Sequence, residues 1–271
     1  MIIKQDRCSG CLDCLPYCPM QAIVVHRATG FAYVIEDECV ECGVCYRAKV
    51  CATDAIYPQD LEWPRTLRME FSDPSSPYLS PVFAERTVAR FQPGLQQLDR
   101  RQLLDRKGEQ LSISGRGTLE MKVNDVSGRY RQGQAGVAAE IGRPGAGARF
   151  GDVQKVAQAL AAVGVSFERE NPVTDLMTDI ATGTFREDIL NEKVLSCIIE
   201  FTVPLGELAP VLRTLQKVAR EIDTVFAVDL ISVVEEDGSI PTVAIAESLG
   251  LRPSMAGKTN VGLGRPLAGI G

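Results

Sequence analysis

The second half of the chain has the most regular alternation of apolar and polar residues. Four stretches, at residues 135–141, 165–170, 194–203 and 225–234, have the length and apolar content of β-strands. We therefore predict four strands in this region. Cys197 lies in the third of them, and we expect it to be a packed core thiol, because a buried cysteine behaves as a small hydrophobic residue.

Two segments between these strands repeat apolar residues every three or four positions, as an amphipathic helix does. The first begins at Asp152, a suitable N-cap residue, and ends at Gly164. The second has its apolar stripe at Leu208, Val211, Leu212, Leu215, Val218, Ala219 and Ile222. Strand, helix, strand, strand, helix, strand is the split βαβ order. We predict an α+β protein whose second domain is a βαββαβ plait over residues 133–240.

The rest of the chain divides by composition. Two short apolar stretches, 23–25 and 31–35, flank a turn and predict a hairpin within an N-terminal domain of residues 1–60. Residues 61–132 are rich in proline and polar residues, which indicates a linker with local structure. Residues 241–271 are Gly-rich, and we expect a tail that becomes ordered only on a partner.

Composition and charge narrow the possible functions. Of the 271 residues, 45% are hydrophobic and 24% are charged, and 29 basic against 35 acidic residues give a net charge of −6. A chain of this charge lacks the basic field that holds nucleic acid. No apolar run approaches the roughly 20 residues of a membrane span, and the N-terminus lacks the layout of a signal peptide. We expect a cytoplasmic protein with no nucleic-acid partner and no membrane span.

Eight of the nine cysteines lie between positions 8 and 51, which argues for metal binding rather than for a disulfide framework. They form two groups of similar spacing, Cys8, Cys11, Cys14 and Cys18, and Cys39, Cys42, Cys45 and Cys51. A structural zinc site usually takes its ligands as two separated pairs. Three cysteines at steps of three on one loop instead suit three irons of a cubane, with a fourth cysteine from elsewhere. Zinc and a three-iron cluster stay open as alternatives.

The two groups belong to an internal repeat. The first three cysteines of each group lie 31 positions apart, as do Asp6 and Asp37, and the segments that contain Cys18 and Cys51 lie 33 positions apart. Each half is therefore expected to be one supersecondary unit.

Residues 1–60 resemble the bacterial two-[4Fe-4S] ferredoxins through these cysteines and through Pro19. The resemblance implies that the fourth cysteine of each group ligates the other cluster. Cluster I would be held by Cys8, Cys11, Cys14 and Cys51, and cluster II by Cys18, Cys39, Cys42 and Cys45. The sequence departs from the family in the five residues before Cys51, where three are usual, and in Ala52, which takes the place of a proline. The longer loop is expected to alter the packing near cluster I.

Other residues of chemical interest have simpler interpretations. His26, the only histidine, is expected at the surface rather than as a ligand or proton donor. Trp63 could cover the clusters, but it more often would anchor a linker to its domain. Gly/Arg-rich segments at 115–129, 142–149 and 264–269 could bind an anion or a partner, or could form tight turns with solvated charges.

Three functions remain open. The first is an electron-transfer subunit of an oxidoreductase complex, which relays single electrons through two [4Fe-4S] clusters between an electron donor and a catalytic subunit. Eight thiolates would fill both clusters and leave no iron for a substrate, which favours this function. The second is a reductase whose own active site lies in the C-terminal region. The two-cluster module followed by residues 115–149 is faintly similar to the iron–sulfur part of 6-hydroxynicotinate-reductase-like enzymes of anaerobic metabolism, which implies an aromatic or heterocyclic substrate. The third is a redox or metabolite sensor that uses the plait, a fold that can also form oligomers.

Overall fold

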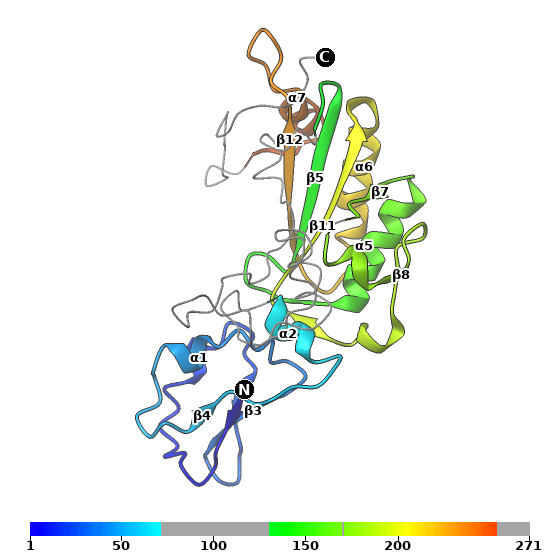
Figure 1. Cartoon of the computed structure of the whole chain (residues 1–271). Helices are drawn as coiled ribbons and strands as arrows, with labels where there is room; N and C mark the ends of the chain where they lie inside the picture. The colour runs from blue at the N-terminus through cyan, green and yellow to red at the C-terminus, as the bar shows by residue number, and fades with distance from the viewer. Residues whose placement is uncertain (72–129, 170, 254–271) are drawn as a thin grey trace, which may run out of the picture. The chain divides into compact units, whose positions relative to one another are not determined.

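The computed structural model describes residues 1–71, 130–169 and 171–253, and the chain forms two compact units (Figure 1). Unit 1 comprises Met1–Arg116, Gly142–Phe150 and Asp188–Ser196, and unit 2 comprises Gly117–Ile141, Gly151–Glu187 and Cys197–Gly271. These units differ from the linear boundaries that the composition predicts. Two segments from within the predicted plait, 142–150 and 188–196, belong to unit 1.

Residues 1–60 form a loop-rich part of unit 1 that is closed by short strands. β1 (Ile2–Ile3) pairs antiparallel with β4 (Ile56–Tyr57), so the beginning and the end of this part meet. β2 (Ile23–Val25) and β3 (Ala32–Val34) form an antiparallel hairpin at the predicted position. Two single-turn helices, η1 (Leu15–Tyr17) and α1 (Val44–Arg47), lie within the cysteine groups.

Elements from beyond residue 60 complete the described part of unit 1. They are α2 (Thr66–Glu70) and the antiparallel pair β6 (Ala148–Arg149) and β10 (Lys193–Val194). Leu67 of α2 is fully buried. The Nε1 of Trp63 donates a hydrogen bond to Oδ2 of Asp188 at 2.7 Å. Trp63 therefore holds the start of the predicted linker to unit 1, as the anchoring interpretation expects.

Unit 2 is built around a four-stranded antiparallel sheet. Its strands, in spatial order, are β12 (Phe226–Ser232), β5 (Gln134–Ile141), β11 (Cys197–Pro204) and β7 (Ser166–Phe167). β5 pairs with β11 over eight residues and with β12 over seven. The protein is therefore of the α+β class, as predicted.

Two long helices lie together on one face of this sheet (Figure 1), α5 (Phe150–Ala162) and α6 (Leu205–Val218). Most of their apolar stripes are buried, as the periodicity predicts. The stripe of the second helix ends earlier than predicted, because α6 ends at Val218, and Ala219 is exposed and Ile222 half-buried. The first helix begins at Phe150, so Asp152 lies in its first turn rather than at its N-cap. On α5, Val153, Val156, Ala157 and Leu160 are fully buried, and on α6, Leu208, Val211, Leu212, Leu215 and Val218 are at most 2% exposed. Facing residues of β5, such as Val137 and Ile141, are also fully buried and complete the core.

Three predicted strands are shorter in the structure. The strand predicted over residues 225–234 spans Phe226–Ser232. The third begins at Cys197 rather than at residue 194, because Lys193 and Val194 pair with β6 in unit 1. The second ends soon after Phe167, where the chain turns and the side chain of Asn171 donates a hydrogen bond to Glu200 at 3.0 Å.

Between β7 and β11, the chain forms short elements that the sequence pattern does not predict. They are η4 (Thr174–Leu176), β8 (Met177–Asp179), β9 (Thr184–Phe185) and η5 (Glu187–Ile189). β8 and β9 pair antiparallel as a small hairpin. Each strand of this hairpin is too short to give a clear alternation of apolar and polar residues.

The prediction of a tail from residue 241 is wrong at its start. Residues Pro241–Ser248 form α7, which contacts α6 and β12. Thr242 and Ala246 of this helix are buried, and the hydroxyl oxygens of Thr242 and Ser232 lie 3.2 Å apart. Pro241 at the first helical position suits a helix start. Residues 254–271 and most of the predicted linker lie outside the described residues.

Within the described residues, no helix is long and apolar enough to cross a membrane.

Candidate metal sites

The first cavity of interest in unit 1, called site A, is lined by the side chains of Cys8, Cys11, Cys14 and Cys51. The first three cysteines come from the loop between β1 and η1, and Cys51 comes from the loop before β4. Ile3, Ala32 and Ile56 contribute to its apolar wall. Cys11 is exposed, whereas Cys14 is buried, so this site reaches the protein surface at Cys11.

The second cavity, called site B, is lined by Cys18, Cys39, Cys42 and Cys45. Cys18 comes from the first cysteine group and the other three from the second group. Met20, Ile23 and Val40 contribute apolar side chains to the wall. Cys39 and Cys45 are buried, and Cys18 and Cys42 are partly exposed. Each cavity is thus lined by one of the two crossed sets of cysteines that the ferredoxin resemblance implies.

The internal repeat is visible in the backbone around both sites. In the first half, Gly10 and Leu12 have positive φ angles of 72° and 66°. The equivalent residues of the second half, Glu41 and Gly43, have positive φ angles of 54° and 67°. Turns that alternate right- and left-handed residues aim successive N–H groups into a concavity, an arrangement found at many iron–sulfur sites. The sequence repeat therefore produces two similar loops.

The fourth cysteine of each site accepts a backbone hydrogen bond from the residue four positions later. The N–H of Ala22 donates to Sγ of Cys18 at 3.2 Å, and the N–H of Ala55 donates to Sγ of Cys51 at 3.1 Å. Cys51 has a further contact, 3.5 Å from Oγ1 of Thr53. Such bonds orient a ligand sulfur and stabilise its negative charge.

The longer loop before Cys51 is accommodated without moving this cysteine away from site A. Lys49 in the loop takes a φ of 52°, and Val50 lines the cavity. Lys49 has no left-handed counterpart in the first half, which lacks the inserted residues. The extra length is therefore absorbed by one additional left-handed residue.

The thiols resist ionisation where they are most deeply buried. Burial, with a smaller contribution from the charge of Glu41, raises the pKa of Cys39 to about 11. Burial and the charges of the neighbouring cysteines together raise the pKa of Cys45 to about 12. Burial also opposes ionisation of Cys51, but hydrogen bonds from Thr53 and Ala55 outweigh it and lower its pKa. Four thiolates in one small cavity repel each other, so a cationic centre is needed to hold all four ionised.

The donor set of each cavity fits an iron–sulfur cluster. Four cysteine sulfurs are the usual ligand set of a [4Fe-4S] cluster, and the apolar walls are typical of the surroundings of such clusters. Four thiolates also suit zinc. Among the described residues, no three His, Cys, Asp or Glu side chains converge as the ligands of a bound metal ion would. The two sites are therefore defined by the cavities that the cysteines line.

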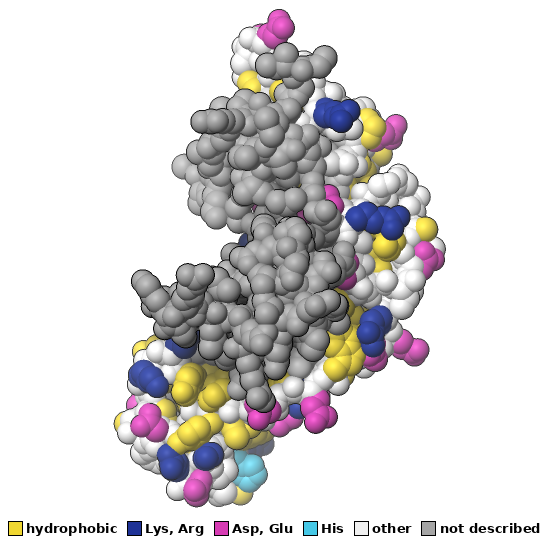
Figure 2. Space-filling model, in the orientation of Figure 1, with side chains coloured by type: hydrophobic (Ala, Val, Ile, Leu, Met, Phe, Trp, Pro, Cys, Tyr) yellow, Lys and Arg dark blue, Asp and Glu magenta, His cyan; other side chains and the backbone are white. Residues whose placement is uncertain are grey.

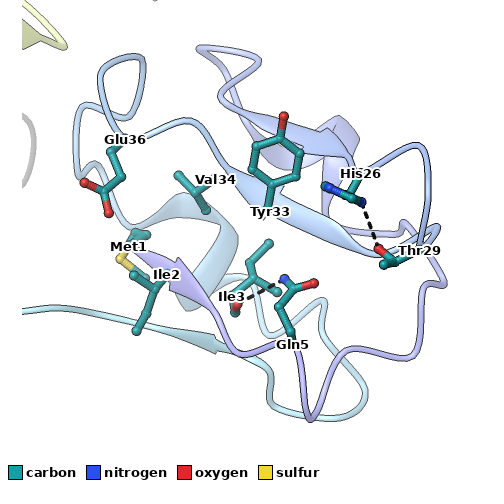
Figure 3. A pocket seen from close by; sticks show the side chains of 9 residues that line it. All are labelled: Met1, Ile2, Ile3, Gln5, His26, Thr29, Tyr33, Val34 and Glu36. Carbon is teal, nitrogen blue, oxygen red and sulfur yellow. Dashed lines mark hydrogen bonds between the residues drawn. The ribbon is translucent and has the colours of Figure 1, made fainter.

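Another depression of unit 1, of about 430 Å³, is lined by no cysteine (Figure 3). It lies beside β1 and the β2–β3 hairpin, and His26 is at one end of it. His26 is exposed, as predicted, and its Nδ1 lies 3.4 Å from the hydroxyl of Thr29. The side-chain amide of Gln5 donates to the carbonyl oxygens of Ile3 and Ala32.

The surface of unit 1 combines exposed aromatic groups with charges. Figure 2 shows hydrophobic side chains among basic and acidic ones on the part of unit 1 that faces the viewer. Tyr17 and Tyr46, which neighbour Cys18 and Cys45 in the sequence, are 45% and 38% exposed. Tyr17 also lines site B, so an aromatic side chain lies between this site and solvent.

The remaining predicted residues fall outside both sites. Cys197 is 1% exposed and belongs to the sheet of unit 2, which agrees with a core thiol. Of the Gly/Arg-rich segments, 142–149 forms a turn and β6 in unit 1, and 115–129 and 264–269 lie outside the described residues. Sequence reasoning missed Arg68, which is 1% exposed. Its position between Leu67 and Met69 was the available signal, since a charge among apolar residues suggests a buried partner.

Comparisons of the chain with protein-family models, with curated proteins and with solved structures give no match. The resemblances to the two-[4Fe-4S] ferredoxins and to 6-hydroxynicotinate-reductase-like enzymes therefore stay predictions from the sequence.

Proposed function

We propose that the protein is an iron–sulfur electron-transfer subunit that carries two [4Fe-4S] clusters. Cluster I is held at site A by Cys8, Cys11, Cys14 and Cys51, and cluster II at site B by Cys18, Cys39, Cys42 and Cys45. The observation that carries the proposal is that each cavity is lined by four cysteines, with the fourth taken from the other sequence group.

A [4Fe-4S] cluster supplies reversible one-electron transfer. The chain's own residues then set the conditions of that transfer. The N–H groups of Ala22 and Ala55 stabilise charge on Cys18 and Cys51, and apolar residues such as Ile3 and Ile23 limit the access of water. All eight ligands are protein thiolates, so neither cluster keeps a position for a substrate. This ligation favours a relay over an enzyme that transforms substrate at a cluster.

The relay has one accessible end. Cys11 of site A is exposed. In site B, two cysteines are buried and the other two are only partly exposed. Electron transfer between proteins is favoured where a cluster approaches the surface, and site A is therefore the side at which we expect exchange with a small electron donor or acceptor. A catalytic oxidoreductase subunit is the expected second partner.

Unit 2 is proposed to be a βαββαβ plait that serves as a module for docking or oligomer formation. The strand order β12-β5-β11-β7, with helices α5 and α6 after the first and third strands, supports this assignment. A plait by itself does not define a function, so the electron-transfer proposal depends on unit 1.

The experiment is a metal analysis of the full chain purified without oxygen, with Cys18→Ser and Cys51→Ser as matched variants. The wild type is expected to hold about eight irons and about eight sulfides per chain. Cys18→Ser should alter the electron paramagnetic resonance signal of cluster II alone, and Cys51→Ser that of cluster I alone. Zinc in place of iron, or only about four irons in the wild type, would overturn the proposal. The reverse pattern in the two variants would overturn the crossed ligation.

A further inference from the structure

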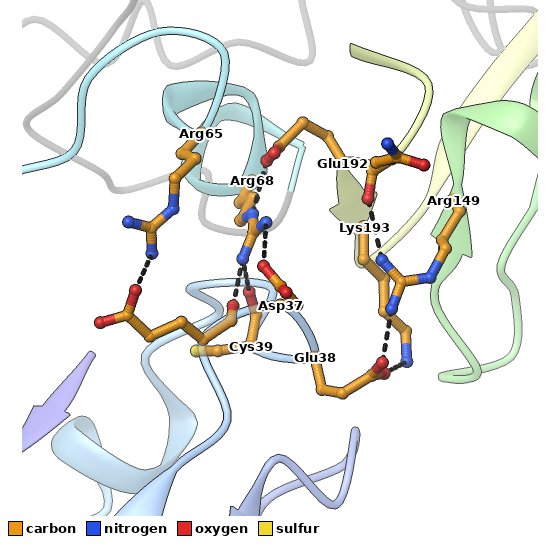
Figure 4. A network of polar contacts seen from close by, with 10 residues as sticks. Asp37, Glu38, Cys39, Arg65, Arg68, Arg149, Glu192 and Lys193 are labelled. Carbon is orange, nitrogen blue, oxygen red and sulfur yellow. Dashed lines mark hydrogen bonds and ion pairs between the residues drawn. The ribbon is translucent and has the colours of Figure 1, made fainter. Parts of the chain in front are cut away.

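The segment that leads into site B is contacted by four basic side chains from beyond residue 60. The segment is Glu36–Cys39, and the basic residues are Arg65 at the N-cap of α2, Arg68 of α2, Arg149 of β6 and Lys193 of β10 (Figure 4). All of them belong to unit 1. The part of the chain with the cysteines is therefore supported from outside residues 1–60.

Arg68 is the most deeply buried of the four, with 1% of its side chain exposed. Its Nε donates to Oε2 of Glu192 at 2.6 Å, and its Nη1 donates to the carbonyl oxygens of Glu36 and, at 3.1 Å, of Cys39. A buried guanidinium is stable only when its donors and charge are satisfied. Arg68 therefore fixes the main chain at Cys39, one of the four cysteines of site B.

The other partner of Arg68 comes from a distant part of the sequence. Glu192 is 7% exposed, and its carbonyl oxygen accepts a hydrogen bond from the N–H of Phe150 at 3.0 Å. Leu195, from the same segment as Glu192, packs against the apolar core of residues 1–60, which contains Cys14 of site A as well as Cys39 and Cys45 of site B. The contacts of segments 142–150 and 188–196 that are specific to site B are therefore the polar ones.

Glu38 adds a second connection of the same kind. Its carboxylate accepts a hydrogen bond from Nζ of Lys193 at 2.6 Å and another from the guanidinium of Arg149. Arg149 also donates to the carbonyl oxygen of Asn191 at 2.8 Å. Glu38, the residue before Cys39, is therefore bound by both segment 142–150 and segment 188–196.

Site A has a different support. The residues that line it lie between positions 3 and 56. The hydrogen bonds described for Cys8 and Cys51 come from residues 4 to 55. The residues that line site B also lie within residues 1–60. The two sites differ in their polar contacts: among the described residues, those of the segment that leads into site B extend to residues 68, 149, 192 and 193, whereas the hydrogen bonds described for site A stay inside residues 1–60.

We propose that Arg68 is a positioning residue for site B, and that this site retains its cluster only when α2 and segments 142–150 and 188–196 are folded against it. Site A, whose described hydrogen bonds come from residues 4 to 55, is expected to keep its cluster without these polar contacts. This inference rests on the proposed function. It adds that cluster binding at site B requires α2 and segments 142–150 and 188–196 to be folded, whereas cluster binding at site A does not.

The test compares Arg68→Gln with Arg65→Gln in the full chain, purified without oxygen. Arg65, the N-cap residue of the same helix, pairs with Glu36 at 3.2 Å through side chains that are 32% and 53% exposed, and no hydrogen bond described for it reaches a cysteine of site B, so it is a matched control. Iron and sulfide are measured per folded chain, and the two clusters are distinguished by electron paramagnetic resonance during a redox titration. Lys193→Met, at the edge of the network, is a milder second variant in case Arg68→Gln does not fold.

Arg68→Gln is expected to lose about half of the iron, with the loss confined to the signal that Cys18→Ser also alters. Lys193→Met should weaken the same signal to a smaller extent, and Arg65→Gln should keep both clusters. Arg68→Lys should not restore the signal fully, because an ammonium cannot reproduce the forked donors of a guanidinium. Retention of both clusters in Arg68→Gln and Lys193→Met, or equal loss of both clusters, would overturn the inference. Wild-type protein without iron would instead overturn the proposed function.

Discussion

The buried ion pair between Arg68 and Glu192 gives a prediction whose size follows from its surroundings. Glu192→Gln keeps the shape of the side chain and one acceptor, but it removes the negative charge beside a guanidinium that is 1% exposed. Loss of one partner of a buried pair costs about 3–5 kcal/mol, and a remaining neutral hydrogen bond returns about 1 kcal/mol. We expect the free energy of unfolding of unit 1 to fall by about 3 kcal/mol, or about 150-fold in the equilibrium constant.

The assay is a urea titration without oxygen, followed by the fluorescence of Trp63, the only tryptophan and a residue of unit 1. Glu36→Gln is the control, because Glu36 pairs with Arg65 through side chains that are 53% and 32% exposed. An exposed pair contributes about 0.2–1 kcal/mol, so this variant should shift the midpoint little. Equal shifts of the urea midpoint for the two variants would show that the buried Arg68–Glu192 pair contributes no more stability than the exposed pair, and would refute the prediction.

Two further predictions concern pH and the C-terminal helix. The hydrogen bond from Lys193, with help from its charge and that of Arg149, lowers the pKa of Glu38 below its ordinary value of 4.5. A lowered pKa means that the pair stabilises unit 1 above pH 4.5 and that this contribution is lost as the pH falls through the folded-state pKa. The difference in thermal stability between wild type and Lys193→Met should therefore be present at neutral pH and disappear in acid; a difference that persists in acid would argue against the pair. For α7, a chain that ends after residue 240 should unfold at a lower temperature than one that ends after residue 253, as measured by circular dichroism, because the helix buries Thr242 and Ala246. Equal melting temperatures would mean that α7 contributes nothing to the core.

Much of unit 2 could be predicted from the sequence, because its elements are long enough to carry a period. The stripe from Leu208 to Val218 repeats over several turns and is buried along α6 as expected. α7 was missed, since its short sequence shows little periodicity and its burial comes from contacts with α6 and β12. The β8–β9 hairpin was missed for the same reason.

The cysteines were informative in the sequence because ligand spacing is a local property. Three cysteines at steps of three lie on one short loop, and the repeat of that loop predicts a second similar site. The exchange of Cys18 and Cys51 between the groups is a long-range property, and it was implied by the resemblance rather than by the spacing. In the structure, each of these cysteines lines the cavity of the other group.

The surroundings of site B were decided by the tertiary structure alone. Val194 begins an apolar stretch that predicts a strand in the plait, yet it and Lys193 pair with residues 148 and 149 in unit 1. Arg68 has its partners at positions 36, 39 and 192, separations that no local pattern can encode. The sequence by itself thus predicted which side chains we propose as cluster ligands, because that prediction depends on short-range spacing. Which segments support each site depends on burial and long-range pairing, and these exist only in the folded chain.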